Sequence, residues 1–238
     1  MRGAALPALL VFALSACGCY EAAKKPPPEL PALGDLNGHV VAVLMTYPTD
    51  CTHKYFWPKT GTWSGNVRTL RYDGEVLFEG DPQGRCYCCG LTFEVFLQAF
   101  ERLCKEVERP YKIKDFDAAK ARRLKSQWFG SAEDRSALRT AIVENGLGIE
   151  VKDWETAREG DFVQLWRRSG TGHSVIFKSW KRSGKEIVGL VYWSTQASTD
   201  GIGENTELFG DADSSVKRDE FFLCRIGDPA TATPPAAR

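Results

Sequence analysis

Three cysteines stand at the beginning of one predicted helix, and this cluster constrains the fold more than any other part of the chain. The segment reads Arg85-Cys-Tyr-Cys-Cys-Gly-Leu-Thr-Phe-Glu-Val-Phe96, and apolar residues continue at helical spacing to about Val107. The N-terminus of a helix is the positive end of its dipole, so a thiol there ionises more readily than an isolated one. The first hypothesis is therefore a nucleophilic cysteine, Cys88 or Cys89, at the start of a helix.

The pattern changes from helical to strand-like along the chain. Two amphipathic helices are predicted over residues 116–128 and 132–144, the second with Ser131 as its N-cap and Gly146 as its stop. Segments rich in Val, Ile, Phe and Trp then predict antiparallel strands over residues 161–167, 173–180, 186–194 and 220–226. Helices followed by antiparallel strands define the α+β fold class.

The folded domain is expected to extend from residue 38 to residue 228. Within it, the apolar run 39–46 predicts a buried strand, and the loop-rich stretch that follows predicts short strands at 67–72 and 75–78. The segment 229–238 is rich in Pro, Ala and Thr, and we expect a disordered tail there.

The chain holds only 3 histidines, so few residues can serve as the base for a nucleophilic thiol. His173 begins a predicted strand after a Gly-Thr-Gly loop, and its ring can project from the sheet toward the helix with the cysteines. We predict that His173 is the base. His39, at the edge of an apolar run, and His53, in a loop beside a cysteine, are the alternatives.

The residue that orients the imidazole is expected on the strand that follows. A hairpin turn centred between Ser183 and Gly184 would place Ser194 opposite His173, with Gln196 on the same face. The amide oxygen of Gln196 can accept the imidazole N–H, and the hydroxyl of Ser194 can do so more weakly.

An aromatic loop supplies candidates for substrate binding. Tyr55, Trp57 and Trp63 can form the wall of a groove for sugars or stem peptides, and Tyr55 can also offer its hydroxyl to an oxyanion. The alternative is that these rings only pack over the sheet.

The first residues predict export. Arg2 precedes an apolar run too short to span a bilayer, and the run ends in Leu14-Ser-Ala-Cys17. This tetrapeptide resembles the bacterial lipobox, which implies a signal peptide over 1–16 and a lipid on Cys17. Gly18 after it resembles the choice that sorts lipoproteins to the outer membrane. The alternative is an ordinary secretory signal cut near Ala16.

Residues 17–37 complete this arrangement, because the Pro-rich segment within them predicts an extended tether. We therefore expect a protein of the bacterial cell envelope, anchored by its lipid at the outer membrane on the periplasmic side. The 31 Lys and Arg balance the 31 Asp and Glu, so charge predicts neither nucleic acid nor an anionic membrane as partner. An oxidising compartment permits disulfides, whose pairing is open among Cys19, Cys51, Cys86, Cys89, Cys104 and Cys224.

Two segments resemble NlpC-type cell-wall peptidases, and CHAP amidases share the arrangement. Cys88-Cys-Gly-Leu-Thr-Phe-Glu-Val-Phe96 is similar to the family's Asp-Cys-Ser-Gly-Leu-Thr/Val-x-x-Val-Tyr/Phe signature. Gly160-Asp-Phe-Val, followed by His173-Ser-Val-Ile-Phe177, is similar to its Gly-Asp-Leu-Val and His-Val-Gly-Ile-Tyr segments. Alignment of these segments places the family's nucleophile on Cys88.

The chain departs from the family at the two neighbours of Cys88. Tyr87 stands where the family has Asp, and Cys89 stands where it has Ser. The resemblance implies a papain-like α+β fold, in which the helix bearing Cys88 packs on the antiparallel sheet bearing His173. It also implies hydrolysis of peptide or amide bonds in peptidoglycan or its stem peptides through an acyl-enzyme, with the backbone N–H of Cys88 at the oxyanion. It implies no cofactor and no metal.

Three other functions fit parts of the sequence. A non-enzymatic lipoprotein stapled by disulfides would bind a cell-wall or protein partner and leave His173 structural. A structural zinc ion would use the cysteines from Cys86 to Cys89. A transglutaminase-like acyl transferase would need an Asp soon after His173, and Asp200 is poorly placed for that role.

Overall fold

The computed structural model describes residues 34–58, 63–131 and 133–235. The expected signal peptide, the expected lipidation site Cys17, Cys19 and most of the expected tether lie outside these residues. Among the helices of the described part, none is long and apolar enough to cross a membrane.

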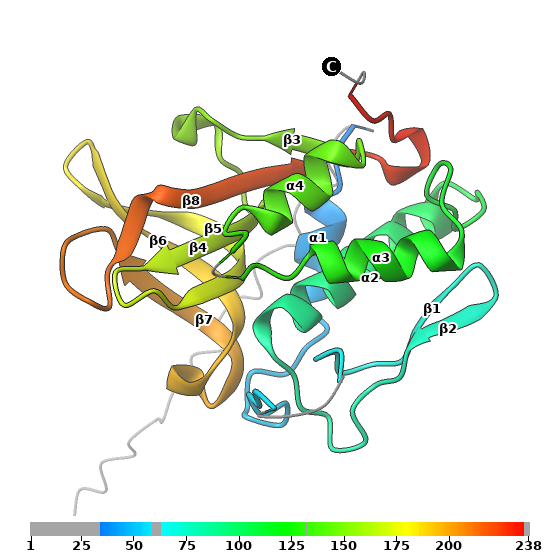
Figure 1. Ribbon diagram of the computed structural model, residues 1–238, viewed down its shortest axis with the longest axis horizontal. Coiled ribbons are helices and arrows are strands. Elements are labelled where there is room, and N and C mark those ends of the chain that lie inside the picture. The colour runs from blue at the N-terminus through cyan, green and yellow to red at the C-terminus, as the bar shows by residue number, and fades with distance from the viewer. Residues whose placement is uncertain (1–33, 59–62, 132, 236–238) are drawn as a thin grey trace, which may run out of the picture.

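The described chain is a mixed α+β fold built around one antiparallel sheet, which lies beside a group of helices (Figure 1). This confirms the fold class at the level of α+β. The strand order is β3-β8-β4-β5-β6-β7, and every pair in this sheet is antiparallel. The strands are β3 (Gly148–Glu150), β4 (Phe162–Arg167), β5 (Gly172–Ser183), β6 (Glu186–Gln196), β7 (Gly201–Leu208) and β8 (Val216–Ile226).

The helices and a small hairpin form the other part of the fold, on the right of Figure 1. The helices are α1 (Asn37–Leu44), α2 (Cys88–Glu106), α3 (Ala118–Gln127) and α4 (Ala137–Glu144). The hairpin pairs β1 (Leu70–Tyr72) with β2 (Glu75–Phe78). Short 3-10 turns are η1 (Trp154–Thr156), η2 (Ala197–Thr199) and η3 (Pro229–Thr231).

Helix α2 runs through the middle of the core. Its residues from Cys89 to Leu97 are all buried, and it packs against α1, β5 and β6. Trp128 stacks on Phe96 at 5.3 Å between ring centroids and meets Phe162 of the sheet edge-on at 5.5 Å. Burial of each such ring stabilises the fold by about 1.5–3 kcal/mol. The start of α2, where Cys88 lies, is therefore held firmly against the sheet.

The opposite face of the sheet has a second apolar cluster. Val163 and Leu165 of β4 contribute to it, whereas Phe162 faces the helices, as alternation along a strand requires. Burial on both faces explains why apolar residues occupy neighbouring positions of β4, as at Phe162 and Val163, rather than only every second one.

The expected strand over residues 39–46 is wrong, because these residues belong mainly to α1. Val40, Val43 and Leu44 are buried against α2, and the Val40 N–H donates to the Leu36 carbonyl at 2.9 Å. A short apolar run fits a buried helix as well as a buried strand. Here the packing against α2 decides, and it overrides the strand preference of valine.

The expected cap at Ser131 is also wrong. The Ser131 hydroxyl accepts hydrogen bonds from the N–H groups of Glu133 and Asp134, but the turn does not continue as a helix. Helix α4 begins later, at Ala137. The serine side chain therefore closes a local turn, which is the other structure that this residue type favours.

The tail is ordered for part of the expected disordered segment. Pro229–Thr231 form η3, whose first turn is capped by the side chain of Asp228. Ala232 is buried, and the Thr233 N–H donates to the carbonyl of Gly146. A capped turn and one buried side chain fix this segment despite its composition.

Candidate active site

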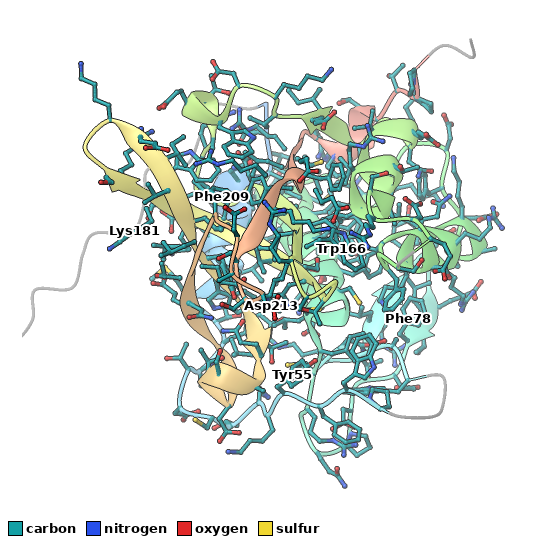
Figure 2. All side chains as sticks on the ribbon, turned by 60° about the vertical axis from the view of Figure 1, so that its left-hand side comes forward. Tyr55, Phe78, Trp166, Lys181, Phe209 and Asp213 are labelled. Atoms are coloured by element: carbon teal, nitrogen blue, oxygen red, sulfur yellow. The ribbon has the colours of Figure 1, made fainter. Side chains whose placement is uncertain are left out.

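Cys88 is the first residue of α2 and lines a cavity of about 690 Å³. The thiol is half-buried, and the first turn of the helix contains no acidic residue that would oppose the positive end of the dipole. The rest of the wall comes from the loop after α1, the loop after α3, and the strands β4 to β7 with their adjoining turns. Figure 2 labels two lining residues, Tyr55 from the loop and Trp166 from β4.

The pKa of the Cys88 thiol is held well below its usual range. The largest cause is a hydrogen bond with the Cys89 side chain, and the nearby His173 ring and the backbone N–H of Ser174 act in the same direction against desolvation. Burial, together with the neighbouring Cys88, raises the pKa of the Cys89 thiol well above its usual range. Of the two adjacent cysteines, Cys88 is thus the one that ionises.

The ring of His173 is held by one defined partner. His173 is buried on β5, and its Nε2 lies 3.0 Å from Oε1 of Gln196 at the end of β6. The Gln196 amide nitrogen donates to the Thr199 hydroxyl at 3.0 Å, and that hydroxyl donates its proton to the Gly201 carbonyl at 2.6 Å.

This chain of hydrogen bonds determines the tautomer of neutral His173. Thr199 has one hydroxyl proton and uses it on a backbone carbonyl, so it accepts from the Gln196 amide nitrogen. The Gln196 oxygen then faces the ring and accepts the Nε2 proton. Nδ1 is left without a proton, which is the state that a base needs.

The expected register between β5 and β6 is wrong by two residues, because the turn lies one residue later. Ser183 pairs with Glu186 and Ile176 with Trp193, so the same register continued to His173 reaches Gln196 rather than Ser194. Of the two residues predicted to orient the His173 ring, Gln196 is therefore the one that contacts it.

Ser194 has another role. Its buried hydroxyl donates to the backbone carbonyl of Ser174 at 2.8 Å, which links β6 to β5. It is not among the described residues that line the cavity. The serine therefore supports the strand that carries His173 and does not orient its ring.

The other two histidines lie elsewhere. His39 is buried in α1, where desolvation lowers the pKa of its ring. His53 has its Nδ1 2.8 Å from the Gly84 carbonyl. Among the described residues that line the cavity, His173 is the only histidine.

Two of the three aromatic candidates line the cavity. Trp57 stacks on Phe129 at 5.7 Å, and both rings are well exposed, at 46% and 40%. Burial, followed by the nearby Cys88 and Cys89, raises the pKa of Tyr55, which therefore keeps its proton for donation. Trp63 packs edge-on against Tyr87 at 5.2 Å and is not among the described lining residues.

Sequence reasoning missed several residues of the site. Phe129, Thr199 and Gln164 carried no signal, since each lies in an ordinary loop or strand pattern. Arg167 and Glu207 were missed too, and they form a paired ionic contact at the cavity, with nitrogen–oxygen distances of 2.8 and 2.6 Å.

Within the described residues, no group of three or more His, Cys, Asp and Glu side chains could hold a metal ion. The six cysteines of the described part are unpaired: Cys51, Cys86, Cys88, Cys89, Cys104 and Cys224. Comparison of the chain with protein-family models, curated proteins and solved structures finds no match.

Proposed function

We propose that this protein is a thiol hydrolase with a papain-like arrangement of helix and sheet, in which Cys88 is the nucleophile and His173 the base. The observation that carries the proposal is the position of Cys88 at the first residue of α2, in the same cavity as a histidine whose tautomer is set by Gln196, and the lowered pKa of the Cys88 thiol agrees with it. A binding protein has no need for such an activated thiol in a cavity.

The reaction follows from these groups. The Cys88 thiolate attacks the carbonyl carbon of an amide, and the backbone N–H of Cys88 and the Tyr55 hydroxyl donate to the developing oxyanion. Protonated His173 gives its proton to the amine nitrogen as the carbon–nitrogen bond breaks. Water, deprotonated by His173, then attacks the thioester, and the carbon–sulfur bond breaks to release the acid and restore the thiolate.

The substrate class is proposed from the resemblance to cell-wall peptidases and from the export signal. Both favour an amide or peptide bond of peptidoglycan, which a lipid-anchored envelope protein would meet. The exposed rings of Trp57 and Phe129 support this choice, since flat apolar rings bind sugars and peptide backbones well.

The first test is limited alkylation of the full-length chain with iodoacetamide at mildly acidic pH, followed by non-reducing mass spectrometry. We expect Cys88 to react much faster than Cys51, the other half-buried thiol of the described part. His173→Ala should reduce this difference and Ser194→Ala should keep it. Cys88 in a disulfide, or no faster than Cys51, would instead favour the stapled binding protein.

Activity is tested next on purified peptidoglycan, with the released amines and acids identified by mass spectrometry. The wild-type chain should release products that Cys88→Ala does not. Persistent transfer to added amines in place of water would favour the acyl transferase.

A further inference from the structure

One polar atom in the cavity lacks a partner. Gln164 lies on β4 and is only 3% exposed, yet its side chain belongs to the wall of the cavity. Its amide nitrogen donates to the backbone carbonyl of His173 at 3.2 Å. Its Oε1 has no hydrogen-bond partner among the described residues.

The orientation of this amide is determined by the His173 carbonyl. If the amide were turned over, Oε1 would face the carbonyl oxygen, and two acceptors would meet. Oε1 is therefore the atom left without a donor. Buried polar atoms in proteins are nearly always paired, so an unpaired acceptor in the wall of a cavity is available to a ligand that brings a donor.

The neighbouring backbone packs closely against this oxygen. Gly130 approaches the Gln164 amide so closely that a Cβ there would come within 2.8 Å of Oε1, and the oxygen itself is buried. Any other residue at this position would push the amide aside. The glycine thus lets the acceptor keep its place in the wall of the cavity.

The acceptor also lies close to the reacting thiol. Gln164 is the direct neighbour of Ser174 across β4 and β5, and both residues line the cavity together with Cys88. A group that reaches Oε1 is therefore near the carbonyl carbon that Cys88 attacks.

The charges around the cavity indicate a neutral group. Arg167 and Glu207 are paired with each other, and apart from the Cys88–His173 pair the other described lining residues are uncharged. A charged acyl group would find no unpaired counter-charge there.

We propose that Gln164 is a specificity-determining residue, whose Oε1 accepts a hydrogen bond from an amide N–H of an uncharged acyl group. The inference rests on the proposed function, since this acyl group is the one that Cys88 takes up. In a peptide substrate the donor is the N–H of the residue whose carbonyl is attacked, two bonds from the attacked carbon.

The test uses two alkylating probes, N-benzyl-2-bromoacetamide and its N-methyl analogue. In the first, an N–H stands two bonds from the carbon that the thiolate attacks; the second has no N–H. The thiolate forms a carbon–sulfur bond and bromide leaves. Rates at Cys88 are divided by the rates of the same probes with free cysteine, which removes differences in intrinsic reactivity.

We expect wild-type Cys88 to prefer the N–H probe by about five- to tenfold, the net effect of one neutral hydrogen bond. Gln164→Leu should bring the ratio to about 1. Gly130→Ala keeps the Gln164 side chain but displaces its amide, and it should lower the ratio as well, which provides a second variant if Gln164→Leu does not fold.

Equal normalised rates in the wild type would overturn the inference and leave Cys88 as a nucleophile. A preference that persists unchanged in both Gln164→Leu and Gly130→Ala would also overturn it, because another group would then be the acceptor. If neither probe labels Cys88 faster than Cys51, the proposed function itself fails and the inference with it.

Discussion

The Nε2 of His173 and the amide oxygen of Gln196 lie 3.0 Å apart, and the second hydrogen-bond partner of that amide is the Thr199 hydroxyl. The ring is thus held by a residue that is itself held by the turn after β6. Since Gln196 is neutral, it orients the imidazole without adding the negative charge that an aspartate would supply.

Removal of the orienting residue should slow the reaction more than it weakens substrate binding. We expect Gln196→Ala to lower kcat for amide hydrolysis by about tenfold or more, since each 1.4 kcal/mol of lost transition-state stabilisation is a factor of ten. Thr199→Val should have a smaller effect in the same direction. Steady-state kinetics measure both.

Ser194→Ala is the matched control on the same strand. It removes a buried hydroxyl that supports Ser174 and should lower the free energy of unfolding by about 1–3 kcal/mol while kcat changes little. A kcat for Ser194→Ala as low as that of Gln196→Ala would contradict the assignment of Gln196.

The rate of Cys88 alkylation should depend on pH in a way that an ordinary thiol does not. An ordinary thiol, with a pKa of about 8.5, reacts slowly below neutral pH. Because the pKa of Cys88 is lowered, first by Cys89 and then by His173 and Ser174, its labelling should stay fast as pH falls through neutrality. A pH–rate profile with mass-spectrometric detection measures this.

Cys89→Ala should move that profile to higher pH, since it removes the hydrogen bond that contributes most to the lowered pKa. Cys89→Ser keeps a donor and should move it less. Coincident profiles for the wild type and Cys89→Ala would show that the neighbouring thiol has no part in the activation.

Glu94 should contribute to stability, although it is a charged residue buried in α2. Its carboxylate accepts from the Tyr47 hydroxyl and from the Val67 N–H, both at 2.6 Å. Glu94→Ala would leave these two donors without an acceptor and should lower the free energy of unfolding by about 2–5 kcal/mol. Urea denaturation measures this, with Glu101→Ala as control. Glu101 is a half-exposed residue of the same helix whose ion-pair partner is Lys105, and we expect a change below about 1 kcal/mol.

The same carboxyl should make stability depend on pH. Burial raises the pKa of Glu94, so the folded chain holds this proton more tightly than the unfolded chain does. The contribution of Glu94 to the free energy of unfolding is complete below its pKa in the unfolded chain, about 4.3. It declines as pH rises through the higher pKa that Glu94 has in the folded chain. The difference in stability between the wild type and Glu94→Ala should therefore narrow from pH 4 upward; a widening would contradict the raised pKa.

Gly90→Ala should disturb the start of α2. A Cβ at Gly90 would come within 2.3 Å of the Gly65 backbone, so the loop before β1 would have to move away. We expect a loss of stability of about 1–3 kcal/mol, together with slower Cys88 labelling. Gly227→Ala, whose nearest neighbour would be 3.7 Å away, is the control and should leave the labelling unchanged.

The sequence predicted the helices and strands that have a strong local pattern. It failed where contacts with distant parts of the chain determine the secondary structure. The apolar spacing after Cys88 and the Val- and Phe-rich segment at β4 were sufficient for α2 and for the central strands. The run 39–46 gave the wrong element because its length and composition suit a helix and a strand equally. Strand β7 was missed because Gly201 and Gly203 weaken the strand pattern.

Those residues of the candidate site that have a signal in their own sequence neighbourhood were predicted. The helix-start position identified the cysteines, and a small number of histidines pointed to His173. A one-residue difference in the turn after Ser183 was enough to exchange Ser194 for Gln196 as the neighbour of the ring. The position of the unpaired Gln164 oxygen depends on contacts with Gly130 and with the His173 carbonyl, so the sequence of β4 alone could not predict it.

The burial of α2 along its length has a practical consequence. The 19 residues of this helix span about 28 Å, and the thiol at one end is activated only while the helix start, β5 and Cys89 keep their places. Loosening of the helix start or of β5 would return Cys88 toward the reactivity of a free cysteine. The alkylation rate of Cys88 at acidic pH therefore measures the fraction of chains with native tertiary structure. It can detect thermal unfolding or a destabilising mutation before any substrate is known.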